Sequence, residues 1–176
     1  MDYYFSPCLT NVYQHQYIDF VMEHYIDLNL PYPFEESFGY IVSPLLMDGV
    51  SILCFDDEDE IAGAFSYIYG TGEHEYTDRH IIQVQVAFIV EQHRRTGLFA
   101  KSLQYLLQHL EAESSTEQVT ELRFWTACND YSRRLFEKFA ERYATAESER
   151  GQLDGYRMLV SELRTYVDRL QTKALI

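Results

Sequence analysis

The chain has 176 residues, a length typical of one domain with a hydrophobic core of its own. Hydrophobic residues make up 47% of the chain, which excludes an intrinsically disordered protein. The formal net charge of -14 argues against nucleic acid as a partner, because binding to phosphates depends on a surplus of Lys and Arg. The same charge is compatible with a cationic substrate such as an amine, and also with the ordinary surface of a soluble cytosolic protein.

The cysteines and histidines do not indicate a metal site or a disulfide framework. Cys8, Cys54 and Cys128 are odd in number and have no CxxC spacing, and the six histidines are scattered without an HExxH pattern. No apolar run is long enough to span a bilayer, and the N-terminus lacks the basic start of a signal peptide. The sequence therefore predicts a cytoplasmic protein with no membrane partner.

The first part of the chain predicts two helices. Apolar residues follow helical spacing over residues 12–28, and Asn11 is a candidate N-cap for this helix. A shorter helix is expected over residues 34–46, with Pro44 disturbing its end.

A hairpin and a central strand come next. Strands over residues 50–55 and 61–70 flank five acidic residues, 56–60. This turn is interpreted as a solvated hairpin tip, because like charges repel and stay hydrated, with cation binding as the alternative. Apolar residues over 80–90 predict a strand that is covered on both faces. Its first face is expected to carry Ile82, Val84, Val86, Phe88 and Val90.

The second half alternates helices and strands. It predicts an amphipathic helix from about Phe99 to Glu113, a strand over 121–127, and a helix over 129–143 capped by its first residue. A strand over 155–160 and an amphipathic helix over 161–174 complete the chain. This order indicates a single α+β domain, 1–176, in which a mixed sheet has helices on both faces.

The junction between the central strand and the following helix predicts a phosphate cradle. Free N–H groups and the positive dipole end of a helix favour an anion. Gly97 lets the backbone approach a bulky group, while Arg94 and Arg95 add permanent charge with a geometry suited to phosphate. Neither the Walker A pattern nor the dinucleotide fingerprint is present. A basic surface turn is the alternative.

These residues resemble a known family. A strand, R-x-x-G-x-x and an amphipathic helix are similar to the acetyl-coenzyme A (acetyl-CoA) motif of the GCN5-related N-acetyltransferases, the GNAT superfamily. The motif reads here Arg94, Arg95, Thr96, Gly97, Leu98 and Phe99. Downstream, FWTACNDYSRRLFEKF resembles the second cofactor motif, in which a strand ends at an asparagine that opens a helix. The resemblance covers roughly residues 50–160. It implies a mostly antiparallel GNAT-like sheet, to which the terminal helix is an addition.

The resemblance also implies an activity and a cofactor site. The protein would be an N-acetyltransferase in which an amine attacks acetyl-CoA directly in a ternary complex. Backbone N–H groups of residues 94–99 would wrap the pyrophosphate, and the thioester would lie where the central strand splays from strand 121–127. The backbone that pairs with the pantetheine arm would be that of Phe88, Ile89 and Val90. The other side of the cofactor would touch Asn129, Ser132 and Phe136.

Two positions depart from the family pattern. Phe99 replaces a frequent Gly or Ala, which leaves the backbone cradle intact. Phe136 falls where many members carry the tyrosine that protonates the leaving thiolate, and phenylalanine has no proton to donate. Tyr131 is therefore the candidate catalytic acid, with Tyr143 as the alternative and an ordinary half-buried ring as the structural interpretation of Tyr131.

The acceptor pocket is expected, by the same resemblance, between the first helices, the hairpin and the loop before the central strand. Its candidate residues are Tyr40, Tyr67, Glu75 and Trp125. Aromatic walls with an acidic group suit an amine, either a small molecule or a peptide. The central strand offers Gln83 and Gln85 but no carboxylate inside it, so we expect water to carry the proton from the amine.

Two other functions remain open at this stage. One is a non-catalytic acyl-CoA-binding or regulatory module of the same fold, which the missing acid and base favour. The other is an interaction protein whose tyrosine-rich surface and final helix bind a partner. The final helix either packs on the sheet or forms the seam of a homodimer.

Overall fold

The computed structural model describes residues 2–113 and 118–174, with side chains up to residue 170. Within them, seven strands form one sheet in the order β1-β2-β3-β4-β5-β7-β6. The strands are β1 (Tyr4–Pro7), β2 (Gly49–Phe55), β3 (Ile61–Tyr69), β4 (Ile81–Ile89), β5 (Glu121–Ala127), β6 (Glu141–Ser148) and β7 (Gly151–Leu159). All neighbouring strands are antiparallel except β4 and β5, which confirms the predicted mostly antiparallel α+β fold.

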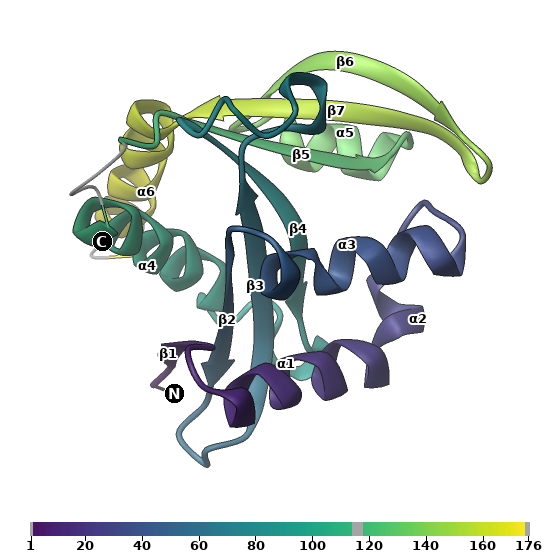
Figure 1. The fold of residues 1–176 in the computed structure, drawn as a ribbon. Coiled ribbons are helices and arrows are strands. Elements are labelled where there is room, and N and C mark those ends of the chain that lie inside the picture. Colours follow the sequence, from purple (N-terminus) through teal and green to yellow (C-terminus); the bar gives the residue numbers. More distant parts are fainter. Residues whose placement is uncertain (1, 114–117, 175–176) are drawn as a thin grey trace.

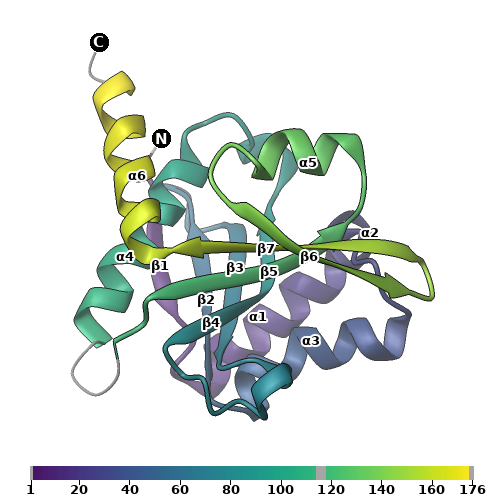
Figure 2. The same ribbon diagram turned by 90° about the horizontal axis from the view of Figure 1, so that it is seen from above.

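Helices cover both faces of the sheet. They are α1 (Asn11–Glu23), α2 (Tyr25–Leu28), α3 (Phe34–Leu46), α4 (Leu98–Glu113), α5 (Asp130–Phe136) and α6 (Val160–Ala174). In Figure 1, α4 and α6 lie to the left of β2, β3 and β4, while α1 and α3 run in front of these strands and extend to the right, where α2 lies. Figure 2 shows α5 and α3 on opposite sides of β5 and β7. The predicted arrangement with helices on both faces is confirmed.

Each face has its own hydrophobic core. Leu106 and Leu110 of α4 pack with Leu163 and Val167 of α6 against the sheet. On the other face, α1 and α3 cover β2, β3 and β4 with a second cluster. Because the apolar side chains of α6 are buried, the final helix packs on the core of its own chain, one of the two outcomes predicted for it.

The strands β4 and β5 separate along their length. They pair only over residues 81–83 and 121–123, although β4 runs to Ile89 and β5 to Ala127. Beyond these three pairs the sheet is divided into a half with β1 to β4 and a half with β5, β7 and β6. The splay expected from the family resemblance is therefore present.

A bulge in β4 changes which side chains face which helices. Ser66 pairs with Val86 but the next residue, Tyr67, pairs with Val84, so Gln85 is the extra residue. As a result Ile82 lies in the cluster under α4, whereas Val86 and Phe88 lie in the cluster under α1 and α3. The prediction that alternate residues from Ile82 to Val90 share one face is wrong, because one extra residue reverses the alternation.

The element boundaries differ from the prediction mainly near the two ends. Strand β1 was not predicted, and the first helix ends at Glu23, before the separate turn α2. Its N-cap is Thr10, whose hydroxyl accepts a hydrogen bond from the N–H of Tyr13, and not Asn11. The helix predicted over 129–143 is half the expected length, because residues 137–140 form a turn and the edge strand β6 begins at Glu141.

Among the described residues, no helix is both long enough and apolar enough to cross a membrane. No group of three or more His, Cys, Asp or Glu side chains in this part of the chain is arranged to hold a metal ion.

Candidate functional site

The loop between β4 and α4 has the backbone of an anion-binding turn. A 3₁₀ turn, Glu91–His93, ends β4, and Arg95 and Gly97 then adopt positive φ angles of 66° and 85°. The backbone N–H groups of Thr96, Gly97 and Leu98 donate no hydrogen bond of ordinary length and angle to the described residues. We call residues 94–98 the phosphate loop, because free N–H groups at a helix N-terminus favour a bound anion.

The two arginines of the loop differ in their contacts. The Nε of Arg94 donates to the backbone oxygen of Ile89 at 2.9 Å, and its guanidinium lies 5.7 Å from the centre of the Phe88 ring. Arg95 is exposed. The side chain of Arg94 thus fixes the loop to the end of β4, while the charge of Arg95 remains accessible to an anion.

Helix α5 follows β5 and so belongs to the other half of the divided sheet. Asn129 is the predicted N-cap, and its Oδ1 accepts the N–H of Ser132 at 2.8 Å. Tyr131 is 71% exposed. The Phe136 ring packs against Phe124 and Tyr156, with centroids 5.0 Å and 5.5 Å away. Phe136 therefore closes an aromatic cluster under α5.

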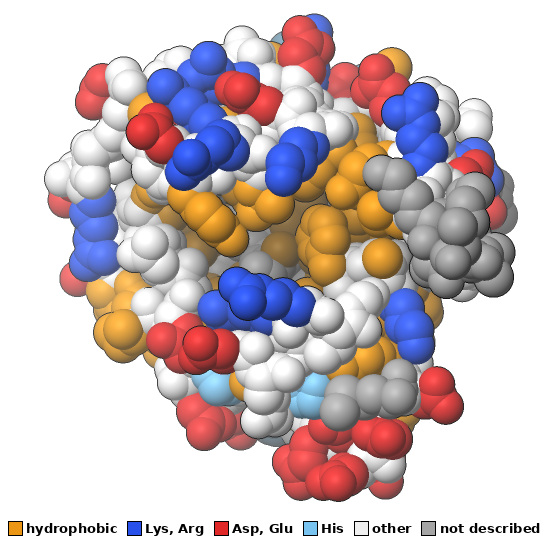
Figure 3. All heavy atoms as spheres, turned by 180° about the vertical axis from the view of Figure 1, so that it is seen from behind, with side chains coloured by type: hydrophobic (Ala, Val, Ile, Leu, Met, Phe, Trp, Pro, Cys, Tyr) orange, Lys and Arg blue, Asp and Glu red, His pale blue; other side chains and the backbone are white. Residues whose placement is uncertain are grey.

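The face of the molecule behind the view of Figure 1 is hollowed. Figure 3 shows a depression with hydrophobic walls and with Lys and Arg side chains above and below it. Acidic side chains gather near the lower edge of the same view. In a chain of net charge -14, this local excess of cations indicates a site for an anionic ligand.

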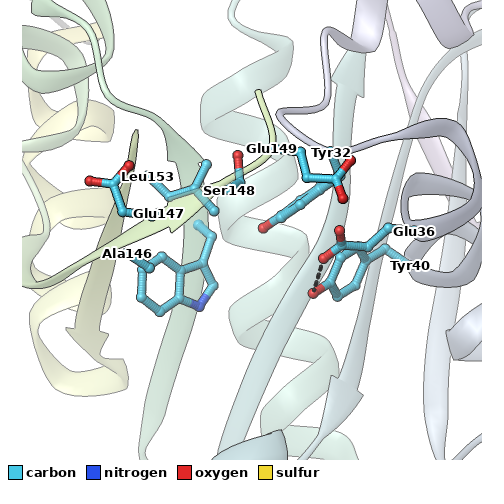
Figure 4. A pocket seen from close by; sticks show the side chains of 9 residues that line it. Tyr32, Glu36, Tyr40, Ala146, Glu147, Ser148, Glu149 and Leu153 are labelled. Atoms are coloured by element: carbon cyan, nitrogen blue, oxygen red, sulfur yellow. Dashed lines mark hydrogen bonds between the residues drawn. The ribbon is translucent and has the colours of Figure 1, made fainter. Parts of the chain in front are cut away.

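A cavity of about 600 Å³ lies between α3 and the strands β5, β6 and β7. It is lined by Tyr32, Glu36, Tyr40, Trp125, Ala146, Glu147, Ser148, Glu149 and Leu153. Figure 4 shows Tyr32, Glu36 and Tyr40 on the side of α3, opposite Ala146 and Leu153 on the strands. Three of the lining residues are glutamates, so the cavity suits a cation.

The aromatic side of the cavity is neutral and held in place. The Tyr40 hydroxyl donates to Oε1 of Glu36 at 3.4 Å, and the rings of Tyr32 and Tyr40 are 4.7 Å apart. Burial, with the Glu36 charge nearby, raises the pKa of both tyrosines above its usual value. At the hairpin between β6 and β7, the Ser148 hydroxyl lies within hydrogen-bonding distance of two backbone oxygens, those of Gly151 at 2.9 Å and of Pro31 at 3.0 Å, and so brings this wall against the loop before α3.

The four residues predicted for the acceptor pocket do not lie together. Tyr40 and Trp125 line the cavity. Tyr67 does not, because the face of β3 that carries it points toward α4, where the ring is fully buried. Glu75 is exposed in the loop before β4 at a φ of 52° and does not line the cavity either.

Sequence reasoning missed Tyr32, Glu36 and the two glutamates of the β6–β7 hairpin. Glu36 had a readable signal, since it lies four residues before Tyr40 and thus on the same face of α3. Glu147 and Glu149 follow the segment that the sequence predicted as a helix, so their place opposite α3 could not be anticipated.

The cavity and the phosphate loop lie on opposite faces of the sheet, and β4 and β5 are separated between them. Trp125, which lines the cavity, lies on β5 beyond the last residue paired with β4. A ligand on one face could therefore reach a ligand on the other through the gap between the strands.

Comparison with solved structures identifies this architecture. An acetyltransferase of the GNAT family from Desulfovibrio desulfuricans matches with a TM-score of 0.64 over 90% of this chain and 99% of its own, at 13% identity. One from Staphylococcus aureus matches with a TM-score of 0.63 over 90% and 99%, at 12% identity. The chain has the GNAT fold, as its motifs predicted.

A third similar structure has a named substrate. Mutant forms of the spermidine/spermine N-acetyltransferase of Vibrio cholerae match with a TM-score of 0.62 over 93% of this chain and 97% of theirs, at 12% identity. No family model and no curated protein sequence matches the chain.

Proposed function

We propose that the protein is an acetyl-CoA-dependent N-acetyltransferase whose acceptor is a small cationic amine. The observation that carries the proposal is the pairing of two sites across the splay of β4 and β5. On one face is a loop with free N–H groups and an accessible arginine, and on the other is an acidic, aromatic cavity. The GNAT fold of the chain supports the same activity.

The residues present fit acetyl-CoA. The N–H groups of the phosphate loop and the charge of Arg95 would hold its pyrophosphate, and the unpaired edge of β4 near Phe88 would accompany its pantetheine arm. The Phe99 side chain, 44% exposed, adds apolar surface beside the loop. When bound, the cofactor supplies an acetyl group activated as a thioester.

The acceptor would lie in the cavity with its reacting nitrogen toward the gap. An alkyl amine attacks only after losing a proton, and its pKa is about 10.4 in water. The glutamates of the cavity favour an ammonium ion, so they would bind a charged group of the acceptor and not the nitrogen that reacts. We expect water to remove the proton of the reacting nitrogen, and a strand N–H to stabilise the oxyanion.

These requirements describe an acceptor with at least two amino groups. One group would stay protonated against Glu36 and Glu149, and the other would react. The spermidine/spermine acetyltransferase among the similar structures supports this substrate class. We also propose a cytoplasmic location, which is supported by the three free cysteines.

A non-catalytic acyl-CoA-binding module is the second candidate. It is favoured by Phe136, which lacks the hydroxyl of a catalytic acid and packs inside an aromatic cluster. Tyr131 stays a predicted acid, and its side chain is largely exposed. The thiolate is a fair leaving group, with a model thiol pKa of about 8.5, so the absence of an acid does not by itself exclude transfer.

The first experiment measures thermal stability with acetyl-CoA, CoA, ATP and NAD. A ligand at one hundred times its dissociation constant stabilises the fold by about 2.7 kcal/mol, and we expect this from both CoA compounds but not from NAD. Arg95→Glu should abolish the response through charge reversal. Arg169→Glu makes the same change at an exposed position of α6 and should have no effect.

Acetyl transfer to spermidine then separates the two candidates. Transfer supports the enzyme, whereas stabilisation by acetyl-CoA without transfer to any amine supports the binding module. No stabilisation by either CoA compound would reject both.

A further inference from the structure

His93 lies directly under the phosphate loop and makes no contact that the proposed reaction uses. Its ring is 3% exposed, although histidine is usually found nearer the surface. Both ring nitrogens have polar neighbours. Nδ1 is 3.1 Å from the hydroxyl of Tyr3, while Nε2 is 3.1 Å from the side-chain nitrogen of Gln92 and 3.5 Å from Oδ2 of Asp56. Tyr3 lies just before β1, and Asp56 lies just after β2.

The hydrogen bonds around Tyr3 have only one consistent direction. The hydroxyl of Thr96 donates to the backbone oxygen of His93 at 2.6 Å, since a carbonyl only accepts. The contact of 2.9 Å between Tyr3 and Thr96 must then use the proton of Tyr3. Tyr3 therefore accepts from His93, which places a proton on Nδ1.

These three hydrogen bonds form a closed series that begins and ends at His93. It runs from His93 to Tyr3, from Tyr3 to Thr96, and from Thr96 back to the backbone of His93. Arg95 lies in the sequence between His93 and Thr96, which this last hydrogen bond joins, and it is a non-glycine residue at a φ of 66°. A left-handed residue of this kind persists only where its surroundings hold it.

On the other side of the imidazole, the Gln92 amide is nearer to Nε2 than Asp56 is. The Oδ1 of Asp56 accepts the N–H groups of Glu58 and Glu60 at 2.9 Å and 3.0 Å, which leaves its Oδ2 toward His93. Asp56 is 7% exposed, so the acidic turn, interpreted from sequence as a solvated tip, has a buried first residue. The position of the hairpin is thereby linked to the phosphate loop.

We infer that His93, held between Tyr3 and Gln92 with Asp56 beside it, is a positioning residue that fixes the phosphate loop in its anion-binding conformation. The inference rests on the proposed function, because it assigns this loop to the phosphates of the donor. It adds a role to residues outside the GNAT motif. Loss of this support should weaken binding of the phosphates and leave the acetyl-transfer step unchanged.

The test compares two acetyl donors, acetyl-CoA and S-acetylpantetheine, which lacks the phosphates. Tyr3→Phe should raise the KM for acetyl-CoA roughly tenfold, the effect expected for a lost hydrogen bond in an ordered site, with kcat unchanged. The kcat/KM for S-acetylpantetheine should stay at the wild-type value. An equal loss with both donors would show a general structural role and would overturn the inference.

Tyr4→Phe is the matched control. It lies next to Tyr3, and its hydroxyl donates to Oδ1 of Asp59 in the same acidic turn at 2.9 Å, but it makes no contact with the phosphate loop. It should behave as the wild type with both donors. At position 93, His93→Asn keeps an N–H near the place of Nδ1 and should retain more affinity than His93→Phe. If Tyr3→Phe, His93→Asn and His93→Phe all bind acetyl-CoA like the wild type, the inference fails.

Inorganic pyrophosphate tests the loop without any transfer reaction. Amide NMR signals of residues 94–99 should shift on its addition to the wild type, and Tyr3→Phe should need roughly tenfold more pyrophosphate for the same shift. This result in a protein without transfer activity would reject the proposed enzyme while keeping the role of His93. A wild type that shows no response to pyrophosphate would overturn the inference itself.

Discussion

Asp154 is a fully buried carboxylate whose charge is balanced by arginines. It lies on β7, where Nε of Arg133 donates to its Oδ2 at 2.8 Å and Arg142 lies 3.7 Å from its Oδ1. The hydrogen bond from Arg133, together with its charge, holds the pKa of Asp154 below the usual value. The pair joins α5 to β7 and so keeps the helix that carries Asn129 in place.

Replacement of this carboxylate should cost stability. Asp154→Asn leaves the partly buried Arg133 without its counter-charge, and we expect a loss of about 3 kcal/mol in the free energy of unfolding at pH 7. Denaturant titration measures it. Glu141→Gln, which breaks the exposed pair with Arg157, should cost less than about 1 kcal/mol and serves as control.

The pH dependence of this loss has a definite sign. Because the folded pKa of Asp154 is lowered, its stabilising contribution is complete above the unfolded pKa, about 3.9, and disappears as the pH falls through the folded pKa. The difference between wild type and Asp154→Asn should therefore shrink on acidification below about pH 4. A difference that is the same at pH 3 and pH 7 would contradict the assignment.

At the scale of elements, the cavity depends on carboxylates from two separate segments. Glu36 comes from α3, and Glu149 follows β6 in the hairpin. The double variant Glu36→Gln/Glu149→Gln should raise the KM for spermidine roughly tenfold, because each charge contributes a few tenths to 1 kcal/mol to binding of a partly solvated cation. Steady-state kinetics at saturating acetyl-CoA measures the change.

Glu35→Gln is the matched control for the cavity. Glu35 lies beside Glu36 in the first turn of α3, but it is exposed and does not line the cavity. It removes the same charge from the same helix and should leave the KM nearly unchanged. An equal effect of the control and the double variant would show that the total charge matters and the cavity does not.

The elements that the sequence predicted best are those in which local pattern and tertiary contacts agree. The bounds of α3 and β5 match the prediction, and Asn129 is the N-cap of α5. The first three residues of β6, 141–143, were predicted as the end of the helix over 129–143, because that helix was read from its N-cap and its spaced apolar residues. Strand β6 is an edge strand with many exposed side chains, and its pairing with β7 decides its conformation.

In the candidate site, too, the part set by local sequence could be predicted, whereas the part set by tertiary contacts could not. The loop of residues 94–99 is a local motif, so its place could be predicted from the spacing of a strand, a glycine and a helix. The cavity brings together α3 and β6, which are far apart in sequence, and the bulge at Gln85 changes the faces of β4. Tyr67 was predicted to line the acceptor pocket but faces α4, because the elements that pack on a strand decide which way each of its faces points.

At the scale of the whole molecule, the cations around one hollow contrast with the negative net charge of the chain. The net charge is -14, yet Figure 3 shows cations around the hollow that is assigned to the donor. The surplus of carboxylates on the remaining surface should draw cationic acceptors toward the protein. The negative electrostatic field of the whole molecule would thus favour approach of the cationic acceptor, whereas the local cations would favour binding of the anionic donor.

Salt dependence tests the role of this field. At saturating acetyl-CoA, kcat/KM for spermidine should fall as ionic strength rises from 0.01 M to 0.15 M, because the screening length falls from about 30 Å to about 8 Å. An arylamine that is uncharged at neutral pH is the control and should show little change. If both acceptors respond alike, the charge of the acceptor does not govern its capture.

Because β4 and β5 pair over only three residues, the two halves of the sheet can turn relative to each other about these three pairs. The part of β4 that is not paired with β5, Val84 to Ile89, is roughly 20 Å long at about 3.3 Å per residue. A rotation of about 3° about these three pairs would move the far end of β4 relative to β5 by roughly 1 Å. Reacting atoms must come within about 3–3.5 Å, so a rotation this small matters.

The final helix, α6, connects the two halves of the sheet. It continues from β7 in one half of the sheet and packs on α4, which follows β4 in the other half. Arg164 of α6 also pairs with Glu111 of α4. Any rotation of one half of the sheet relative to the other must slide α6 along α4. The stiffness of the α4–α6 contact therefore limits how far the two halves can turn.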